Sequence, residues 1–468
     1  MTILSLVSTI VWLDILSAMT PPNTPSWICR RASFLLRVIP FVLALVGSTF
    51  ASDPFRITSF SELGAIGWTN AFAHGVNWLE WAPSVEGPWS AAESYYTTRS
   101  AGEGQLEPRP GNAYYRLISA EVNPTPQGYT NLINSYGIIE TIAGNGLIGL
   151  DTTNGWQDSF EGGYATNATL SRPHFAMADD AGNTYIVDKN SHSVLKVTTD
   201  GRIHTVIGTH EPGDNGDGPH YGTNQALSFP NGLWVRGDGT VYVLDTGNGE
   251  VRRLDTNGVV TGLFVISPSA ETNGVPGGRG LWVNEDETMA IFCTGKALQQ
   301  WKGGQVTIIS DKFNDLGNII VTSTGDVIAT DRGANRVYQV SMNGGFVGTR
   351  TVIAGDGKGG AKRVRDGTAA LSASLSGVRG VWPVPTGGLL LATHAGSQLV
   401  YMDASGTLYV LVDGATSPNH TGDGAWFHSP GLKLAEIRSV TMDRLGNILI
   451  CENDFGYIRR IRFNRALP

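Results

Sequence analysis

A seven-residue unit recurs along the last two thirds of the chain and constrains its fold more than any other feature. The unit is a Gly, any residue, four mostly apolar residues and an acid, at Gly182–Asp188, Gly239–Asp245, Gly325–Asp331 and Gly446–Glu452. Relaxed copies at Gly387–Thr393 and Thr288–Thr294 end in Thr, and the second also lacks the Gly. Each copy predicts a turn followed by a buried strand. Six copies indicate a repeat architecture.

Further strands are predicted around each copy. A third strand begins six residues after the acid, and an upstream strand has its first polar residue 13 to 15 residues before the end of the unit. Five copies have a fourth, outer strand: 203–207, 259–263, 306–309, 351–354 and 408–412. The sixth copy has none after it, and the similar segment Gly137–Gly144 is expected to supply it. Six four-stranded units predict an all-β, six-bladed β-propeller closed by an N-terminal strand.

Short motifs within the repeats resemble those of NHL-repeat propellers. They are Thr141-Ile142-Ala143-Gly144-Asn145-Gly146, Phe229-Pro230-Asn231-Gly232, Ala373-Ser374-Leu375 and the Asp-Gly pairs at 217–218, 366–367 and 423–424. The resemblance covers about 137–468 and is weakest over 277–313, where the repeat is short and lacks the acid. It implies the fold more than the function, because one fold hosts many activities.

The first polar residue of each first strand defines a ring of six candidate ligand-binding residues. The loops entering strand one and leaving strand two of a propeller blade share one face, so these side chains are expected around the central mouth. They are His174, Asn231, Arg279, Asn318, Arg379 and Arg438. The three arginines predict a cationic spot that clamps a carboxylate, sulfate or phosphate. Alternatively, each arginine pairs with an acid of a neighbouring blade and only fixes the ring.

The acids at the ends of the second strands are interpreted as structural residues. They are Asp188, Asp245, Asp331 and Glu452. Side chains of this kind accept hydrogen bonds from nearby backbone N–H groups and shape turns.

Metal and catalytic signatures are weak. The resemblance to six-bladed propellers implies, as an alternative, a metal-assisted lyase or hydrolase, but the predicted ring has one His and no carboxylate, and His394 comes from another blade. The Asp214–Gly218 segment does not continue into a calcium loop, because its twelfth position is Gln225. No nucleophile elbow or Walker loop is present. We therefore assign no catalytic residue, cofactor or metal.

The first 51 residues predict a secretory signal peptide. Arg30, Arg31 and Arg37 precede the apolar run 38–47, and small residues stand before a cleavage point after Ala51. The alternative is an uncleaved anchor beginning near Ser33, and either Met1 or Met19 initiates the chain. Removing three Arg and one Asp with this segment changes the net charge from −8 to −10. Cys293 and Cys451 remain, at equivalent points of opposite blades, and are expected to be unpaired core residues.

Residues 53–122 lack the repeat and predict a separate, small β domain, joined to the propeller by a linker at 123–136. The domain is rich in aromatic residues and resembles the fibronectin-III-like modules of extracellular bacterial proteins. Its strands are expected near Val76–Trp81 and Ala113–Ile118. Its aromatic rings either stack on sugars or, as favoured for so small a domain, form its own core.

Taken together, these features favour a secreted, periplasmic or cell-surface binding module that is monomeric and has no membrane span after signal cleavage. Its expected partner is an anionic or polar glycan or a protein ligand bound at the mouth. The acidic balance argues against nucleic acid as a partner. The alternatives are the metal-assisted enzyme and a scaffold in which every polar ring residue is structural.

Overall fold

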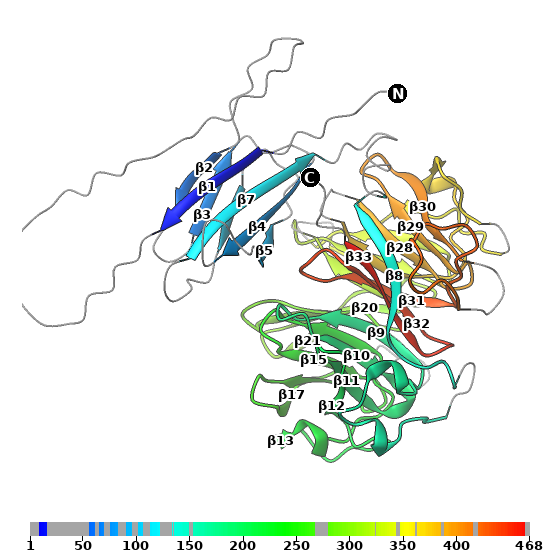
Figure 1. The fold of residues 1–468 in the computed structure, drawn as a ribbon. Coiled ribbons are helices and arrows are strands. Elements are labelled where there is room, and N and C mark those ends of the chain that lie inside the picture. The colour runs from blue at the N-terminus through cyan, green and yellow to red at the C-terminus, as the bar shows by residue number, and fades with distance from the viewer. Residues whose placement is uncertain are drawn as a thin grey trace, which may run out of the picture. The chain divides into compact units, whose positions relative to one another are not determined.

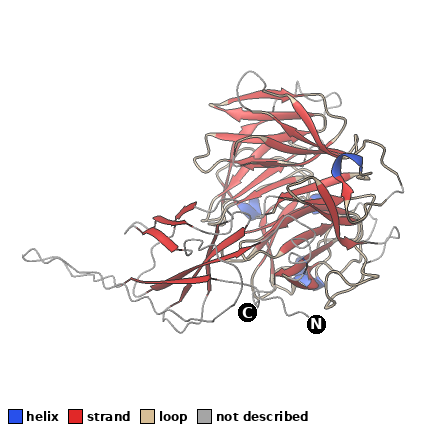
Figure 2. Cartoon of the chain, turned by 90° about the horizontal axis from the view of Figure 1, so that it is seen from above, coloured by secondary structure: helices blue, strands red, loops and turns tan. Residues whose placement is uncertain are grey.

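In the residues that it describes, the computed structural model is all-β, with strands joined by turns and short helical segments (Figure 2). It forms two compact units, Met1–Glu121 and Val122–Pro468. In the first unit the structure describes residues 9–15, 56–60, 65–69, 75–82, 90–95, 102–105 and 113–121. In the second it describes residues 133, 135–148, 153–266, 279–322, 324–342, 347–360, 363–384, 388–414 and 420–463.

The described strands of the N-terminal unit form two antiparallel sheets. One has the order β1 (Thr9–Ile15), β7 (Ala113–Glu121), β4 (Gly75–Ala82) and β5 (Ser90–Tyr95), and the other has the order β2 (Arg56–Phe60), β3 (Ala65–Thr69) and β6 (Gly102–Gln105). Trp68 and Tyr115 are buried, as a role in the core requires. The side chains of Trp78, Trp81 and Trp89 lie outside the described residues.

Strand β1 falls within the segment predicted to be a signal peptide. It pairs antiparallel with β7 along its whole length, from Thr9 opposite Ser119 to Ile15 opposite Ala113. The apolar run 38–47 and the predicted cleavage point lie outside the described residues, so the signal peptide stays a prediction. Within the described ranges, no helix has the length and apolarity needed to cross a membrane.

The second unit is the six-bladed propeller that the repeats predict. Blade 1 consists of β9 (Pro173–Ala178), β10 (Thr184–Asp188), β11 (Ser193–Val197) and β12 (Ile203–Ile207). Blade 2 consists of β14 (Gly232–Val235), β15 (Val241–Asp245), β16 (Glu250–Leu254) and β17 (Val259–Val265). Blade 3 consists of β18 (Leu281–Val283), β19 (Met289–Thr294), β20 (Ala297–Lys302) and β21 (Gln305–Ser310). Blade 4 consists of β22 (Leu316–Val321), β23 (Val327–Asp331), β24 (Arg336–Val340) and β25 (Arg350–Ala354). Blade 5 consists of β27 (Val378–Pro383), β28 (Leu389–Thr393), β29 (Gln398–Met402) and β30 (Thr407–Asp413). Blade 6 consists of β31 (Ile437–Met442), β32 (Ile448–Glu452), β33 (Tyr457–Phe463) and β8 (Tyr136–Ala143).

The first strand of every blade lines the centre of the ring. Each of these strands contacts the first strand of the next blade, in the order β9, β14, β18, β22, β27 and β31, and β31 returns to β9. The apolar core lies between adjacent blades. One cluster, for example, joins Leu399 and Tyr401 of blade 5 to Val440 and Ile450 of blade 6.

Closure by an N-terminal strand is confirmed. Strand β8 pairs antiparallel with β33, with Ile139 opposite Ile461 and Ala143 opposite Ile458. In Figure 1 the cyan β8 lies against the red strands of the last blade. Ile139 is fully buried in the core between blades 5 and 6, so residues from the two ends of the unit share one sheet.

Two blades have a fifth strand that the repeat analysis did not predict. In blade 2, β13 (His220–Tyr221) pairs with β17, and in blade 5, β26 (Thr368–Ala369) pairs with β30. Single bridges between Tyr164 and Arg202 and between Ile138 and Trp426 stand at similar outer positions. These two-residue pairings are too short to have a recognisable apolar pattern.

Close approach of the first strands explains why glycine accompanies several ring residues. A Cβ on Gly232, next to Asn231, would lie 2.6 Å from the carbonyl oxygen of Arg279 in the next blade. A Cβ on Gly317, next to Asn318, would lie 2.7 Å from the carbonyl oxygen of Arg379. Only glycine allows the backbones to approach this closely.

Candidate functional site

The predicted ring residues all lie at the first strands. His174, Asn318, Arg379 and Arg438 are on β9, β22, β27 and β31, while Asn231 comes one residue before β14 and Arg279 two residues before β18. All six are buried, with exposed fractions of 2% for His174 and Asn318, 4% for Asn231, 8% for Arg279 and Arg438, and 9% for Arg379. We call these six residues the central ring.

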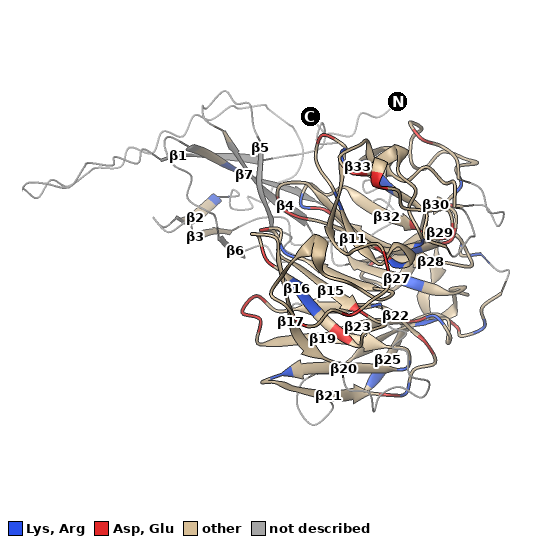
Figure 3. Cartoon of the chain, turned by 90° about the horizontal axis from the view of Figure 1, so that it is seen from below, with Lys and Arg blue, Asp and Glu red and all other residues tan. Residues whose placement is uncertain are grey.

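Burial and repulsion between neighbouring cations lower the pKa values of several central-ring residues. Burial and then the charges of Arg438 and Arg332 lower the pKa of Arg279 to about 9. Burial and then Arg438 and Arg279 lower the pKa of Arg379 to about 7. The pKa of His174 lies well below its usual range, first because of burial and then because of Arg438 and Arg279. The imidazole of His174 is therefore neutral beside three guanidinium groups. Figure 3 shows how basic and acidic residues are distributed over the blades.

The central arginines differ in their partners. Arg438 Nη2 lies 3.5 Å from Asp454 Oδ1, which Arg172 Nη2 also contacts at 2.9 Å. Among the described residues, Arg279 and Arg379 form no ion pair with a carboxylate, and the buried Nε and Nη1 atoms of both lack a hydrogen-bond partner. Most buried polar atoms have a partner, and Arg279 and Arg379 each have two such nitrogen atoms without one in the described chain, whereas Arg438 and Arg459 have one each.

The acids at the ends of the second strands bind loops instead of the central arginines. Each carboxylate accepts a hydrogen bond from the backbone N–H located 17 residues earlier. The donors are Ser171 for Asp188 (2.7 Å), Ser228 for Asp245 (2.7 Å), Asn314 for Asp331 (2.8 Å) and Ala435 for Glu452 (2.9 Å). The repeated contact fixes the loop that enters the first strand of the same blade. Within the described chain, none of the four acids contacts Arg279, Arg379 or Arg438.

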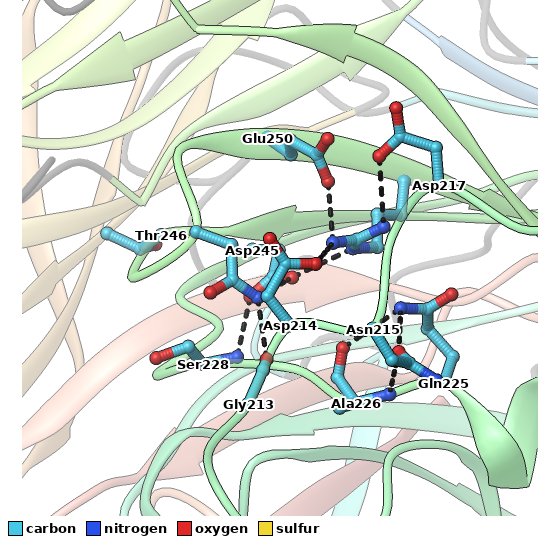
Figure 4. A network of polar contacts seen from close by, with 12 residues as sticks. Gly213, Asp214, Asn215, Asp217, Gln225, Ala226, Ser228, Asp245, Thr246 and Glu250 are labelled. Atoms are coloured by element: carbon cyan, nitrogen blue, oxygen red, sulfur yellow. Dashed lines mark hydrogen bonds and ion pairs between the residues drawn. The ribbon is translucent and has the colours of Figure 1, made fainter.

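Two of these acids have an arginine partner that the sequence analysis did not single out. Arg252, on β16, is fully buried and contacts Asp245 at 2.9 Å, Glu250 at 2.6 Å, Asp214 at 3.1 Å and Asp217 at 3.6 Å (Figure 4). Arg459 occupies the same position in blade 6 and contacts Glu452 at 3.3 Å and Asp423 at 2.8 Å. In both blades the arginine stands seven residues after the acid, a spacing readable from the sequence.

A His and two acids gather beside the central ring. His394 Nε2 lies 3.0 Å from Glu436 Oε2 and 4.0 Å from Asp454 Oδ2, and one ligand atom from each of the three residues lies within 4.8 Å of the other two. Burial and then Arg379 and Arg438 hold the pKa of His394 far below its usual range. This donor set fits a divalent cation, although the same guanidinium groups repel one.

Glu436 and Asp454 were missed because each stands two residues away from a position that the repeat singles out. Glu436 precedes Arg438 and Asp454 follows Glu452. Neither belongs to the repeated unit, and the contacts of Asp454 with Arg172 and Arg438 span 282 and 16 residues. Only the folded ring brings these residues together.

The expected free cysteines are confirmed. Cys293 and Cys451 are both buried and unpaired. Burial raises the pKa of the Cys293 thiol to about 11, so it remains protonated and behaves as a small core residue.

Comparisons with known proteins support the propeller fold. No protein-family model matches the chain, and no curated protein matches it either. A structure of a protein of unknown function from Bacteroides thetaiotaomicron is 13% identical with a TM-score of 0.55, over 89% of this chain and 99% of that one. An auxiliary nutrient binding protein from the same organism is 11% identical with a TM-score of 0.51, over 88% and 98%. Another, from Bacteroides ovatus, is 10% identical with a TM-score of 0.51, over 85% and 93%.

Proposed function

We propose that this protein is a secreted binding module that holds an anionic ligand at the centre of the propeller. Arg279, Arg379 and Arg438 serve as anchors, and Asn231, Asn318 and His174 complete the polar recognition. The observation that carries the proposal is the pair of buried guanidinium groups, on Arg279 and Arg379, that have no carboxylate partner in the described chain.

The physical reason is the cost of an uncompensated buried charge. Taking a charged group out of water costs several kcal/mol unless an opposite charge or good hydrogen bonds replace the lost hydration. Arg252 shows how this chain compensates a structural arginine, with four carboxylates around it. Arg279 and Arg379 lack such compensation within the described chain, and an anion from outside would supply it through charge-assisted hydrogen bonds. The names of two fold relatives, which are auxiliary nutrient binding proteins, agree with a binding role.

The proposal is tested by titrating the purified protein with small carboxylates, sulfate and acidic sugars in a calorimeter, beside the variants Arg279→Gln and Arg379→Gln. We expect each variant to lose at least about tenfold in affinity, since a hydrogen bond to a charged group contributes about 1.5–3 kcal/mol. Each variant should unfold at the same or a higher denaturant concentration, because it removes one of several repelling charges. The control is Arg462→Gln, in which the changed side chain is 52% exposed and pairs with Glu140 on the outer edge of blade 6. Variants that unfold more readily while anion binding is unchanged would make the arginines structural.

A second candidate function is a metal-assisted lyase or hydrolase, which the cluster of His394, Glu436 and Asp454 favours. One imidazole and two carboxylates are a donor set that Zn²⁺ accepts. In this case the central arginines would hold an anionic group of the substrate beside the metal. Metal analysis of the purified protein, repeated on His394→Ala, separates the two functions: one bound ion per chain that is lost in the variant supports the enzyme, and metal-free protein that binds anions supports the binding module.

A further inference from the structure

The central ring holds unpaired acceptors as well as unpaired donors. Asn318 is 2% exposed, and both its Oδ1 and its Nδ2 are buried without a hydrogen-bond partner among the residues that the structure describes. Oδ1 of Asn231, which is 4% exposed, also lacks a partner among them. The backbone N–H of Asn318 donates to Thr330 Oγ1, and that hydroxyl group has two alternative acceptors, the carbonyl oxygens of Arg379 at 2.7 Å and Asn318 at 3.2 Å. The amide side chain of Asn318 takes no part in these contacts.

The order of the blades places these amides on both sides of an arginine. Asn231, Arg279 and Asn318 occupy equivalent positions in blades 2, 3 and 4, and Arg379 and Arg438 follow in blades 5 and 6. Adjacent first strands are in direct contact, as the approach of Gly232 to the Arg279 carbonyl illustrates. One half of the central ring thus alternates amide, guanidinium and amide groups, and the other half adds two further guanidinium groups.

A simple inorganic anion cannot satisfy this set. Sulfate has only acceptor oxygens, so it pairs with guanidinium N–H groups and leaves the carbonyl oxygens of Asn231 and Asn318 without a donor. Each such buried atom costs about 1–3 kcal/mol when it stays unpaired. A neutral sugar has hydroxyl groups that donate and accept, but it leaves the guanidinium charges uncompensated. A molecule that has an anionic group and several hydroxyl groups can satisfy both kinds of atom.

We propose, building on the anion-binding function above, that the central ring recognises an acidic sugar, with its anionic group on Arg279 and Arg379 and its hydroxyl groups on Asn231 and Asn318. The shared chemistry is a polyhydroxylated organic anion. A sugar carboxylate and a sugar phosphate both have it, and they are separate arms of the test.

The experiment is a calorimetric titration of the full chain with glucuronate, glucose 6-phosphate, glucose, acetate and sulfate. At least one of the two acidic sugars is expected to bind at least tenfold more tightly than glucose, acetate and sulfate. Whichever of glucuronate and glucose 6-phosphate binds more tightly identifies the anionic group as carboxylate or phosphate. If acetate or sulfate binds as tightly as both acidic sugars, the inference is wrong but anion binding stands. If none of the anions binds, the proposed function itself fails.

The variant Asn318→Leu separates recognition from folding. Leucine has the same branched arrangement of four side-chain heavy atoms and removes both unpaired amide atoms, so the variant is expected to unfold at the same or a higher denaturant concentration. Its affinity for the preferred acidic sugar should fall at least tenfold, and by a larger factor than its affinity for acetate. The matched control is Asn257→Ala, in an exposed turn of blade 2. Unchanged acidic-sugar binding in Asn318→Leu would overturn the inference, and Asn231→Leu repeats the test should the first variant fail to fold.

Discussion

Each buried ionised side chain in this propeller can be compared with the groups that compensate its charge. Arg252 and Arg379 are both nearly or fully buried, yet Arg252 meets four carboxylates and Arg379 has no ion pair in the described chain. The structural Arg252 and the proposed ligand-binding Arg379 thus differ in their surroundings, although both stand on strands of the same repeat. The composition of the chain cannot make this distinction, because it counts only the charges.

Replacing Arg252 should strongly destabilise the propeller. Arg252→Met leaves Asp245 fully buried without its cation, and breaking a buried ion pair on one side costs about 3–5 kcal/mol. The free energy of unfolding is measured by urea denaturation. The control is Arg253→Met on the same strand, where the side chain is 29% exposed and pairs with Glu287, so its loss should cost at most about 1 kcal/mol. Equal losses in the two variants would contradict the role assigned to Arg252.

Asp188 should make the stability of the protein fall as the pH rises. Burial raises the pKa of Asp188 to about 7, although the hydrogen bonds from Ser171 and Ser191 act in the opposite direction and lower it. The folded state therefore keeps a proton that the unfolded chain releases near pH 4, so this contribution to stability is lost between about pH 4 and 7. Asn cannot ionise and can still accept both hydrogen bonds.

The measurement for Asp188 is the urea midpoint at pH 5 and pH 8. We expect the wild-type midpoint to fall over this range by more than that of Asp188→Asn, and the two midpoints to differ most at pH 8. Asp238→Asn, in the exposed turn before β15, is the control. If the midpoint depends on pH equally in Asp188→Asn and the wild type, the pKa of Asp188 in the folded protein is not raised into this pH range.

At the scale of the strand, β8 connects the start of the propeller to its end, and one apolar side chain should account for much of that connection. Ile139 is fully buried between blades 5 and 6, whereas its neighbour Ile138 is 37% exposed on the same strand. Ile139→Ala should cost about 2–5 kcal/mol of the free energy of unfolding, and Ile138→Ala less than about 1 kcal/mol. Thermal and urea denaturation of the two variants test this pair. Similar losses would mean that the backbone pairing of β8, rather than its packing, closes the ring.

The strands of the propeller could be predicted from the sequence because each repeat buries the same pattern of side chains. The predicted outer strand 203–207 is β12, and the prediction that Gly137–Gly144 supplies the last outer strand is confirmed by β8. The two-residue strands β13 and β26 could not be predicted, since two residues show no periodicity. The pairing of β1 with β7 was also missed, because it joins segments about a hundred residues apart.

The candidate site could be predicted only in part. The repeat register identified the six positions of the central ring, because equivalent positions of the first strands meet at the ring axis. It did not single out Arg252 and Arg459 as the cations that the acids Asp245 and Glu452 bind, although each arginine stands seven residues after its acid. It could not identify Asp454 as the acid beside Arg438, because Asp454 lies outside the repeated unit.

For the whole molecule, the boundary between the two units leads to a prediction about independent folding. All six blades, β8 included, lie within residues 122–468. A fragment of residues 122–468 should therefore melt in one cooperative transition and bind the same anions as the full chain. A fragment of residues 146–468 lacks β8 and leaves β33 as an unpaired edge, which exposes the buried partners of Ile139 and favours aggregation.

Circular-dichroism melting and size-exclusion chromatography compare the two fragments. We expect the shorter fragment to have a lower Tm and to elute partly as aggregate, with a difference larger than that caused by Ile139→Ala alone, because both pairing and packing are lost. If the longer fragment fails to fold, the N-terminal unit contributes to the stability of the ring. If the shorter fragment is as stable as the longer one, β33 does not need β8, and the ring is held by the contacts among its first strands, such as the hydrogen bond from Thr441 Oγ1 to the Ala176 carbonyl at 2.8 Å.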